Sequence, residues 1–239
     1  MSGLNPERSV LDSTRVERLE TSNEGGFDVE LTLPPRRRGV VLITNGQSSG
    51  TKSPRSRHIA SFLRERELGT LLVECFCHEP LGDGTNADRI LRAIQWLREE
   101  DGTRPVPIGC LATGSSVGGA LTVAAREPML IQALVVCGAV PDSVLPLLPA
   151  IKTPILIVLG SRDTQTLQRS HQVIERLGAT HRHVEAVPGA CEHFHEPGTL
   201  DAACIHAANW FRRFLSLPGH AVVEMPTAPP SEVSRSGDR

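Results

Sequence analysis

The 239-residue sequence lacks any apolar run of about 18 residues, the length that a membrane-spanning helix requires. Its first 20 residues are polar and lack the apolar core of a secretory signal peptide. We therefore expect a cytoplasmic protein whose six cysteines are mostly reduced thiols. Neither sign of charge predominates, because 25 Lys and Arg stand against 27 Asp and Glu. This balance indicates no nucleic-acid partner and no membrane partner.

The sequence also lacks internal repeats, and its length suits one buried core better than two. We expect residues 1–14 to be a flexible N-terminus. Residues 218–239 are rich in proline, serine and charge, which is typical of a disordered tail. Residues 15–217 then form a single domain, and the sequence leaves its oligomeric state open.

Apolar runs of strand length alternate with helical patterns, which indicates an α/β fold with a mostly parallel sheet and helices on both faces. Two upstream strands alternate in polarity, as an antiparallel opening pair does. The eight expected strands are 15–20, 27–33, 39–44, 70–74, 108–113, 133–139, 155–159 and 183–187. The expected helices are 54–68, 86–100, a segment ending near 126, 165–177 and 199–215. About 14 residues separate Val140 from Ile155, so no lid domain is expected there.

Two groups of cysteine and histidine could suggest a metal site. Cys75, Cys77 and His78 form one group, and residues 191–195 form the other. The spacing of the first group is not one that zinc sites use. In the expected sheet the two groups lie five strands apart, which is over about 20 Å at about 4.8 Å per strand. We therefore expect no metal and no cofactor.

The sequence Gly114-Ser115-Ser116-Val117-Gly118 matches G-x-S-x-G between a strand and a helix. That context is the one in which a nucleophile elbow presents a serine at a sharp turn. Asp163 and His193 each follow a later strand, so the order serine, acid, histidine also fits a catalytic triad. All three segments fall at the carboxyl ends of strands, where open α/β sheets form their sites.

Several segments resemble one known family. They are TNGQSSGTKSPRSRHIASFLRERELGTLLVE, residues 113–128, residues 154–163 and VPGACEHFHEPG. Over roughly residues 15–217 the chain is similar to the dienelactone-hydrolase-like branch of the α/β-hydrolase superfamily. The resemblance implies a cytoplasmic hydrolase that acts on a small ester or lactone.

The G-x-S-x-G match and the order of the three residues give each a role in a serine hydrolase. Ser116 would attack the carbonyl, His193 would transfer the proton, and Asp163 would orient the imidazole. The backbone N–H groups of Gln47 and Val117 would form the oxyanion hole. His195 is the substitute for His193 as the base.

A second interpretation follows when the family pattern is laid on the sequence without gaps. The family serine then falls on Gly114, the family histidine on Glu192, and a His-Gly pair on Asn45-Gly46. In this interpretation the chain is a catalytically inactive hydrolase-fold protein used for ligand or partner binding. Ser116 is then an ordinary serine at a helix N-terminus, Asp163 caps the next helix, and His193 is a surface-loop residue. Sequence alone leaves both interpretations open.

Overall fold

The computed structural model describes residues 13–21, 25–46, 53–75, 83–100, 103 and 106–215. Within this part of the chain, eight strands form one sheet in the order β1-β2-β4-β3-β5-β6-β7-β8. The strands are β1 (Ser13–Thr21), β2 (Gly25–Leu33), β3 (Gly39–Asn45), β4 (Leu68–Glu74), β5 (Ile108–Thr113), β6 (Ala133–Cys137), β7 (Ile155–Gly160) and β8 (Arg182–Val187). The expected flexible N-terminus and disordered tail lie almost wholly outside the described residues.

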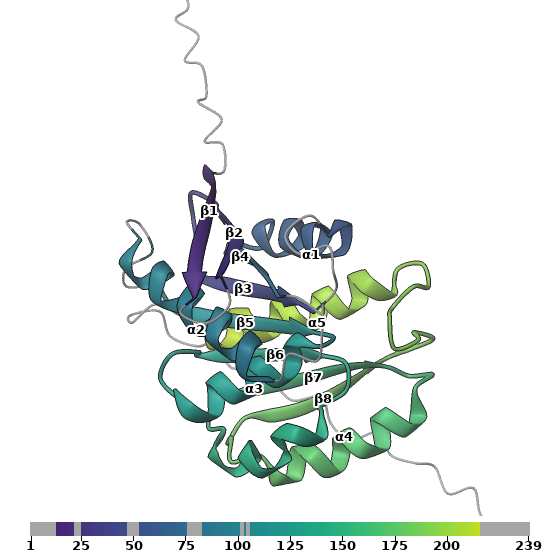
Figure 1. The fold of residues 1–239 in the computed structure, drawn as a ribbon. Helices are drawn as coiled ribbons and strands as arrows, with labels where there is room; N and C mark the ends of the chain where they lie inside the picture. Colours follow the sequence, from purple (N-terminus) through teal and green to yellow (C-terminus); the bar gives the residue numbers. More distant parts are fainter. Residues whose placement is uncertain are drawn as a thin grey trace, which may run out of the picture.

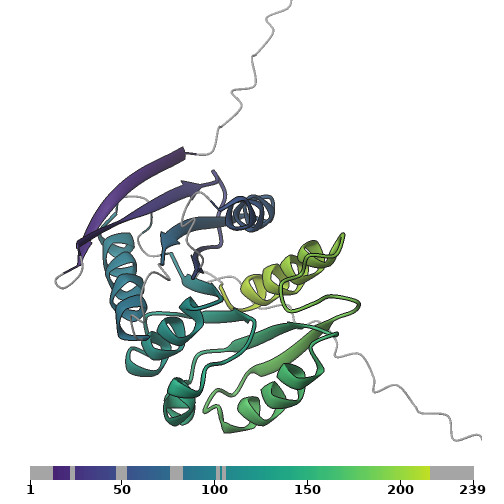
Figure 2. The same ribbon diagram turned by 45° about the vertical axis from the view of Figure 1, so that its right-hand side comes forward.

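Helices cover both faces of this sheet (Figures 1 and 2). They are α1 (Pro54–Arg64), α2 (Asp83–Glu99), α3 (Ser116–Arg126), α4 (Thr164–Arg176) and α5 (Thr199–Phe214), with the 3-10 helix η2 (Asp142–Ala150) between β6 and β7. A minimal connection therefore replaces a lid, as expected. No helix in the described part of the chain is both long and apolar enough to cross a membrane.

The strand directions confirm the α/β fold class. β1 pairs antiparallel with β2, and β2 pairs antiparallel with β4. Every other neighbouring pair, from β4 across to β8, is parallel. The strands β3 and β5 are buried at every position, because helices pack on both of their faces. This burial explains why they were visible in the sequence as continuous apolar runs.

The first helix ends earlier than its sequence pattern predicted. Ser53 caps its N-terminus, because the Ser53 side chain accepts a hydrogen bond from the Ser56 N–H. The helix ends at Arg64, however, and Glu67 takes a positive φ of 61°. The predicted helix ran to residue 68, but Leu68 and Gly69 lie inside β4, where Gly69 pairs with Val40 of β3. Parallel pairing with β3 therefore overrides the local helical pattern.

Candidate active site

The turn between β5 and α3 has the geometry of an elbow, and Gly114 lies at its tip. Gly114 is exposed and takes a φ of 59°, in the left-handed region that favours glycine. A Cβ atom placed on Gly114 would meet nothing closer than the Gly46 nitrogen at 4.0 Å. A side chain at this position would therefore project into open space. The prediction that Ser116 occupies the tip is wrong.

Ser116 is instead the first residue of α3, and it is fully buried. Its Oγ lies 3.0 Å from Thr44 Oγ1, 3.1 Å from the Thr44 carbonyl oxygen and 2.9 Å from the Thr113 carbonyl oxygen. The Thr113 N–H also donates to this oxygen over 3.3 Å. The hydroxyl thus joins the ends of β3 and β5 to the start of α3. It points into the protein rather than toward a substrate.

The end of β3 packs closely against the elbow. The Ser115 hydroxyl donates to the Gly46 carbonyl over 3.1 Å, and the Gly46 N–H donates to the Thr113 carbonyl over 3.2 Å. A Cβ atom on Gly46 would overlap Ser115 Oγ and would lie 2.5 Å from the Ser115 nitrogen. Gly46 therefore has to be glycine for the two segments to approach this closely.

Two buried asparagines hold the same turn, and the sequence analysis missed the role of both. The Asn45 carboxamide donates to Ser56 Oγ over 3.2 Å and accepts from Thr113 Oγ1 over 3.2 Å. Asn86, on α2, donates to the Ser115 carbonyl over 3.2 Å. These contacts depend on strand register and helix packing, so neither leaves a local sequence signal. Asn45 acts as a structural residue at the position of the family's His-Gly pair.

Asp163 caps the helix that follows it. Its Oδ1 accepts a hydrogen bond from the Thr166 N–H over 3.1 Å, and its carbonyl accepts from the Leu167 N–H over 3.0 Å. Asp163 is half-buried and follows β7, which is the position predicted for the acid of a catalytic triad. Its carboxylate is committed to the N-terminus of α4, an interaction that also stabilises the helix dipole.

The loop after β8 carries the expected base. His193 is exposed, its Nδ1 lies 3.3 Å from the Glu192 carboxylate, and its ring packs edge-on against that of His195 at 5.3 Å. The His193 carbonyl accepts a hydrogen bond from the Arg55 guanidinium. Arg55 also lies over the buried ring of Phe194, 5.6 Å from its centroid. Glu192 and His193 therefore interact with each other at the protein surface.

Glu196 fastens this loop to the end of β7. Its carboxylate accepts from the Cys191 N–H over 2.9 Å and pairs with Arg162 over 2.9 Å. The hydrogen bond from the Cys191 backbone is the main reason that the pKa of Glu196 falls below its ordinary value of 4.5. The loop also runs directly over Gly160, where an added Cβ would overlap the carbonyl oxygens of Ala190 and Cys191. The loop is therefore positioned by backbone contacts.

The structure does not bring the expected triad together. Ser116, Asp163 and His193 are all described, and no hydrogen bond joins any two of them. The Val117 N–H, expected in the oxyanion hole, donates to the Gly114 carbonyl over 3.2 Å. Gln47, the other expected donor, lies outside the described residues. The catalytic roles of these residues stay a prediction that this geometry does not favour.

Cys75, Cys77 and His78 are the first group of residues that could suggest a metal site. Burial raises the pKa of Cys75 to about 12, so its thiol is protonated at neutral pH. Cys77 and His78 lie outside the described residues. Within the described ranges, no group of three potential ligand side chains could hold a metal ion. The five described cysteines are free thiols.

Solved structures similar to this chain include a dienelactone hydrolase and several esterases. A dienelactone hydrolase from Anabaena variabilis has a TM-score of 0.78 and 28% identity, over 85% of this chain and 98% of that protein. A cold-adapted esterase from an Arctic intertidal metagenomic library has a TM-score of 0.67 and 16% identity, over 88% and 99% of the two chains. An esterase from Pyrococcus furiosus has a TM-score of 0.70 and 12% identity, over 90% and 96%. No protein-family model matches the chain.

Two Mycobacterium tuberculosis proteins, from different strains, are similar in sequence and are both named "putative phosphoribosyl transferase". Each is 32% identical over 199 residues, which cover 79% of this chain and 44% of the relative. This chain therefore spans less than half the length of the curated relatives it matches.

The sheet order, the elbow between β5 and α3 and the similar solved structures together show that this chain has the α/β-hydrolase fold. Within that fold the chain is similar to the dienelactone hydrolase from Anabaena variabilis, which agrees with the resemblance seen in its sequence. Its solved relatives support a hydrolase-like class and identify no substrate for this chain.

Proposed function

We propose that this chain is a hydrolase-fold protein that has lost its serine nucleophile and binds a ligand at the carboxyl ends of its strands. The observation that carries the proposal is Gly114, at the tip of the elbow with open space above its Cα. A serine hydrolase needs a hydroxyl at this point to form the acyl-enzyme. The buried hydroxyl of Ser116, two residues on, is hydrogen-bonded to Thr44 and Thr113 beneath the turn.

The position of the base supports the same proposal. In the ungapped alignment the family histidine falls on Glu192, whose side chain is exposed and lies against His193. Asp163, at the position of the acid, caps α4 instead of orienting an imidazole. The elbow, the acid and the loop after β8 are thus retained as a scaffold. The groups that would attack and transfer a proton are absent from their positions.

Restoring the missing groups tests the proposal directly. Gly114→Ser combined with Glu192→His would place a hydroxyl at the tip and an imidazole on the loop. We expect hydrolysis of small p-nitrophenyl esters by the double variant and none by the wild type. The matched control is Gly25→Ser, because Gly25 has a similar φ of 74° and open space but lies on β2. Turnover by the wild type would contradict the proposal.

Ligand binding is tested by thermal unfolding in the presence of small lactones, esters and their carboxylic acids. A ligand that binds only the folded state raises the melting temperature with its concentration. We expect at least one such class to do so, and we expect Gly114→Leu to remove the effect by filling the space above the tip. If none of these compounds raised the melting temperature, the proposed ligand binding would be contradicted.

A second candidate function is hydrolysis of a small ester or lactone by Ser116, His193 and Asp163. It is favoured by the 28% identity with the dienelactone hydrolase of Anabaena variabilis. It requires the elbow to rearrange by two residues so that Ser116 replaces Gly114 at the tip. Ester turnover by the wild type that is lost in Ser116→Ala, with the fold intact, would support this candidate over the first.

The two mycobacterial relatives are named as phosphoribosyl transferases, whereas this chain has a hydrolase fold. The matched segment covers 44% of those proteins and corresponds to a hydrolase fold in this chain. We therefore propose that any phosphoribosyl transfer belongs to the part of those relatives that this chain does not match. Activity of this chain alone on a phosphoribosyl donor would contradict that assignment.

A further inference from the structure

The strand β1 forms one edge of the sheet. It runs for nine residues from Ser13 to Thr21 and pairs on one side with β2. On its other side no strand of the described chain pairs with it, as Figures 1 and 2 show. Val16, the fourth residue of the strand, is 64% exposed. An edge of this length presents a row of backbone donors and acceptors that can pair with another strand.

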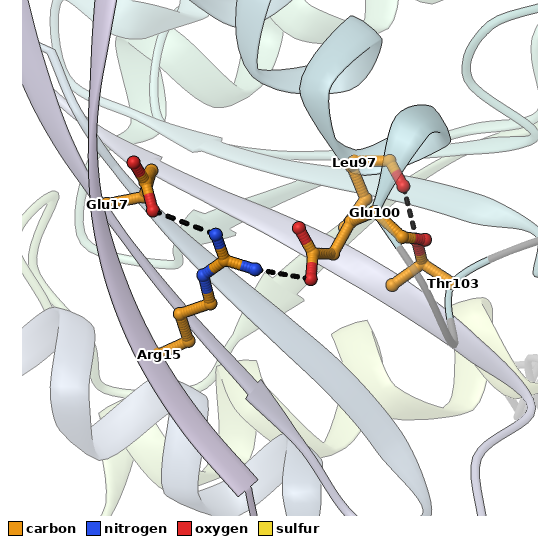
Figure 3. A network of polar contacts seen from close by, with 5 residues as sticks. All are labelled: Arg15, Glu17, Leu97, Glu100 and Thr103. Atoms are coloured by element: carbon orange, nitrogen blue, oxygen red, sulfur yellow. Dashed lines mark hydrogen bonds and ion pairs between the residues drawn. The ribbon is translucent and has the colours of Figure 1, made fainter.

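Charges on β1 alternate in sign along each face of the strand. Arg15 and Glu17 share the face that packs toward α2, and they pair with each other over 3.0 Å. Arg15 also reaches Glu100 over 2.6 Å (Figure 3). On the opposite face Arg18 and Glu20 lie 4.0 Å apart. Each face of the strand therefore carries an arginine followed two residues later by a glutamate.

This order of charges is self-complementary when two copies of β1 pair antiparallel. In such a pair, related by a two-fold axis perpendicular to the sheet, residues that lie opposite each other point to the same face of the sheet. Because side chains alternate between the faces along a strand, the numbers of two opposite residues are both odd or both even. With Val16 on the axis, Arg15 of each copy lies opposite Glu17 of the other. Moving the axis to Glu17 or to Arg18 would place two like charges opposite each other, which is unfavourable. An axis at Leu19 leaves only residues 17–21 paired.

We propose that β1 pairs with β1 of a second copy of this chain, with Val16 opposite Val16, to form one continuous sheet across a two-fold dimer. Backbone hydrogen bonds and burial of the two Val16 side chains supply the affinity. The Arg15–Glu17 pairs select the register, because exposed ion pairs add little affinity of their own. Each guanidinium has five donors, so Arg15 can keep its contact with Glu100. This inference is independent of the function proposed above.

A second copy fits this edge better than an unrelated peptide. Charged residues on an edge strand usually discourage pairing, because they meet unmatched or like charges. A strand that pairs antiparallel with β1 must place a glutamate opposite Arg15 and an arginine opposite Glu17. A second copy of β1 does this, because its own Glu17 and Arg15 take those positions. The charges on β1 therefore disfavour pairing with other strands and favour pairing with a second copy of β1.

Cross-linking tests the register. In the proposed dimer the two Val16 Cα atoms lie about 5 Å apart, within the range of a disulfide. We expect Val16→Cys to form a covalent dimer under mild oxidation. Arg18→Cys is the matched control on the same face. Its two copies would lie four residues apart along the strands, about 13 Å, and should not cross-link. Cross-linking of both variants, or of neither, would overturn the proposed register.

Sedimentation velocity tests the dimer itself, with the full chain and a concentration series. We expect wild-type protein to shift from monomer to dimer as concentration rises, and Val16→Lys to stay monomeric because it places two ammonium groups on the axis. Since Val16 is exposed, the melting temperature of the dilute variant should match that of the dilute wild type. A wild type that remains monomeric, or a dimer that persists in Val16→Lys, would overturn the proposal.

Discussion

The hydroxyl oxygen of Ser116 lies 3.0 Å from that of Thr44, buried under the turn whose tip is Gly114. The two residues belong to α3 and β3, so this contact joins the elbow helix to the neighbouring strand. The same G-x-S-x-G spacing that predicts a nucleophile here produces a structural hydroxyl. Ser116 lies two residues after the tip, so it falls in the first turn of α3 and not at the tip itself.

The structural role of Ser116 predicts a loss of stability on its removal. Ser116→Ala would leave buried groups of Thr44 and Thr113 with fewer partners, which typically costs about 1–3 kcal/mol. We expect urea denaturation to show a decrease of that size. Ser115→Ala is the control: Ser115 is exposed, and its hydroxyl contacts the Gly46 carbonyl, so we expect a smaller loss. An unchanged stability in Ser116→Ala would contradict this role.

The close approach of β3 to the elbow predicts a difference between two glycines. In Gly46→Ala the new methyl group would collide with the Ser115 backbone, so the segments must separate. In Gly114→Ala the methyl group has open space, and the cost is the positive φ, roughly 1–2 kcal/mol. We expect a larger fall in melting temperature for Gly46→Ala. Equal effects of the two substitutions would refute the packing argument.

Much of the fold was predictable because its central strands are buried on both faces. The strand from Ile108 to Thr113 was predicted with the bounds that the structure has, since proline and small residues delimit an apolar run. The end of the first helix was not predictable, because residues 65–68 continue a helical pattern that pairing of β4 with β3 interrupts. Such pairing depends on distant segments and leaves little local signal.

The candidate site was predictable in position but not in detail. The sequence located the elbow, Asp163 and the loop of His193 at the strand ends, where the structure has them. It could not decide which residue forms the tip, since Gly114 and Ser116 both suit a strand–helix turn. The backbone angle of Gly114 decides this question, and it depends on how β3 and α2 pack on the turn.

The loop after β8 should respond to acid. Because the folded pKa of Glu196 lies below its ordinary value of 4.5, its carboxylate favours the folded state. This contribution is fully present above about pH 4.5 and disappears as the pH falls through the lower folded value.

We therefore expect Glu196→Gln to lower the melting temperature at neutral pH, with the difference from wild type vanishing in acid. A series of thermal unfolding curves against pH measures this. Glu192→Gln is the control, because the Glu192 carboxylate is exposed and pairs with the exposed His193. A difference that is constant with pH would show that the charge of Glu196 has no part in holding the loop.

The most direct measurement is the reaction of the protein with a fluorophosphonate probe, read by intact mass and peptide mapping. An activated serine reacts, whereas a buried structural hydroxyl does not. We predict no modification of the wild type, no change in Ser116→Ala, and labelling at residue 114 in Gly114→Ser combined with Glu192→His. Modification of the wild type at Ser116 that disappears in Ser116→Ala would contradict the account, because it would place the nucleophile where the structure has a buried hydroxyl.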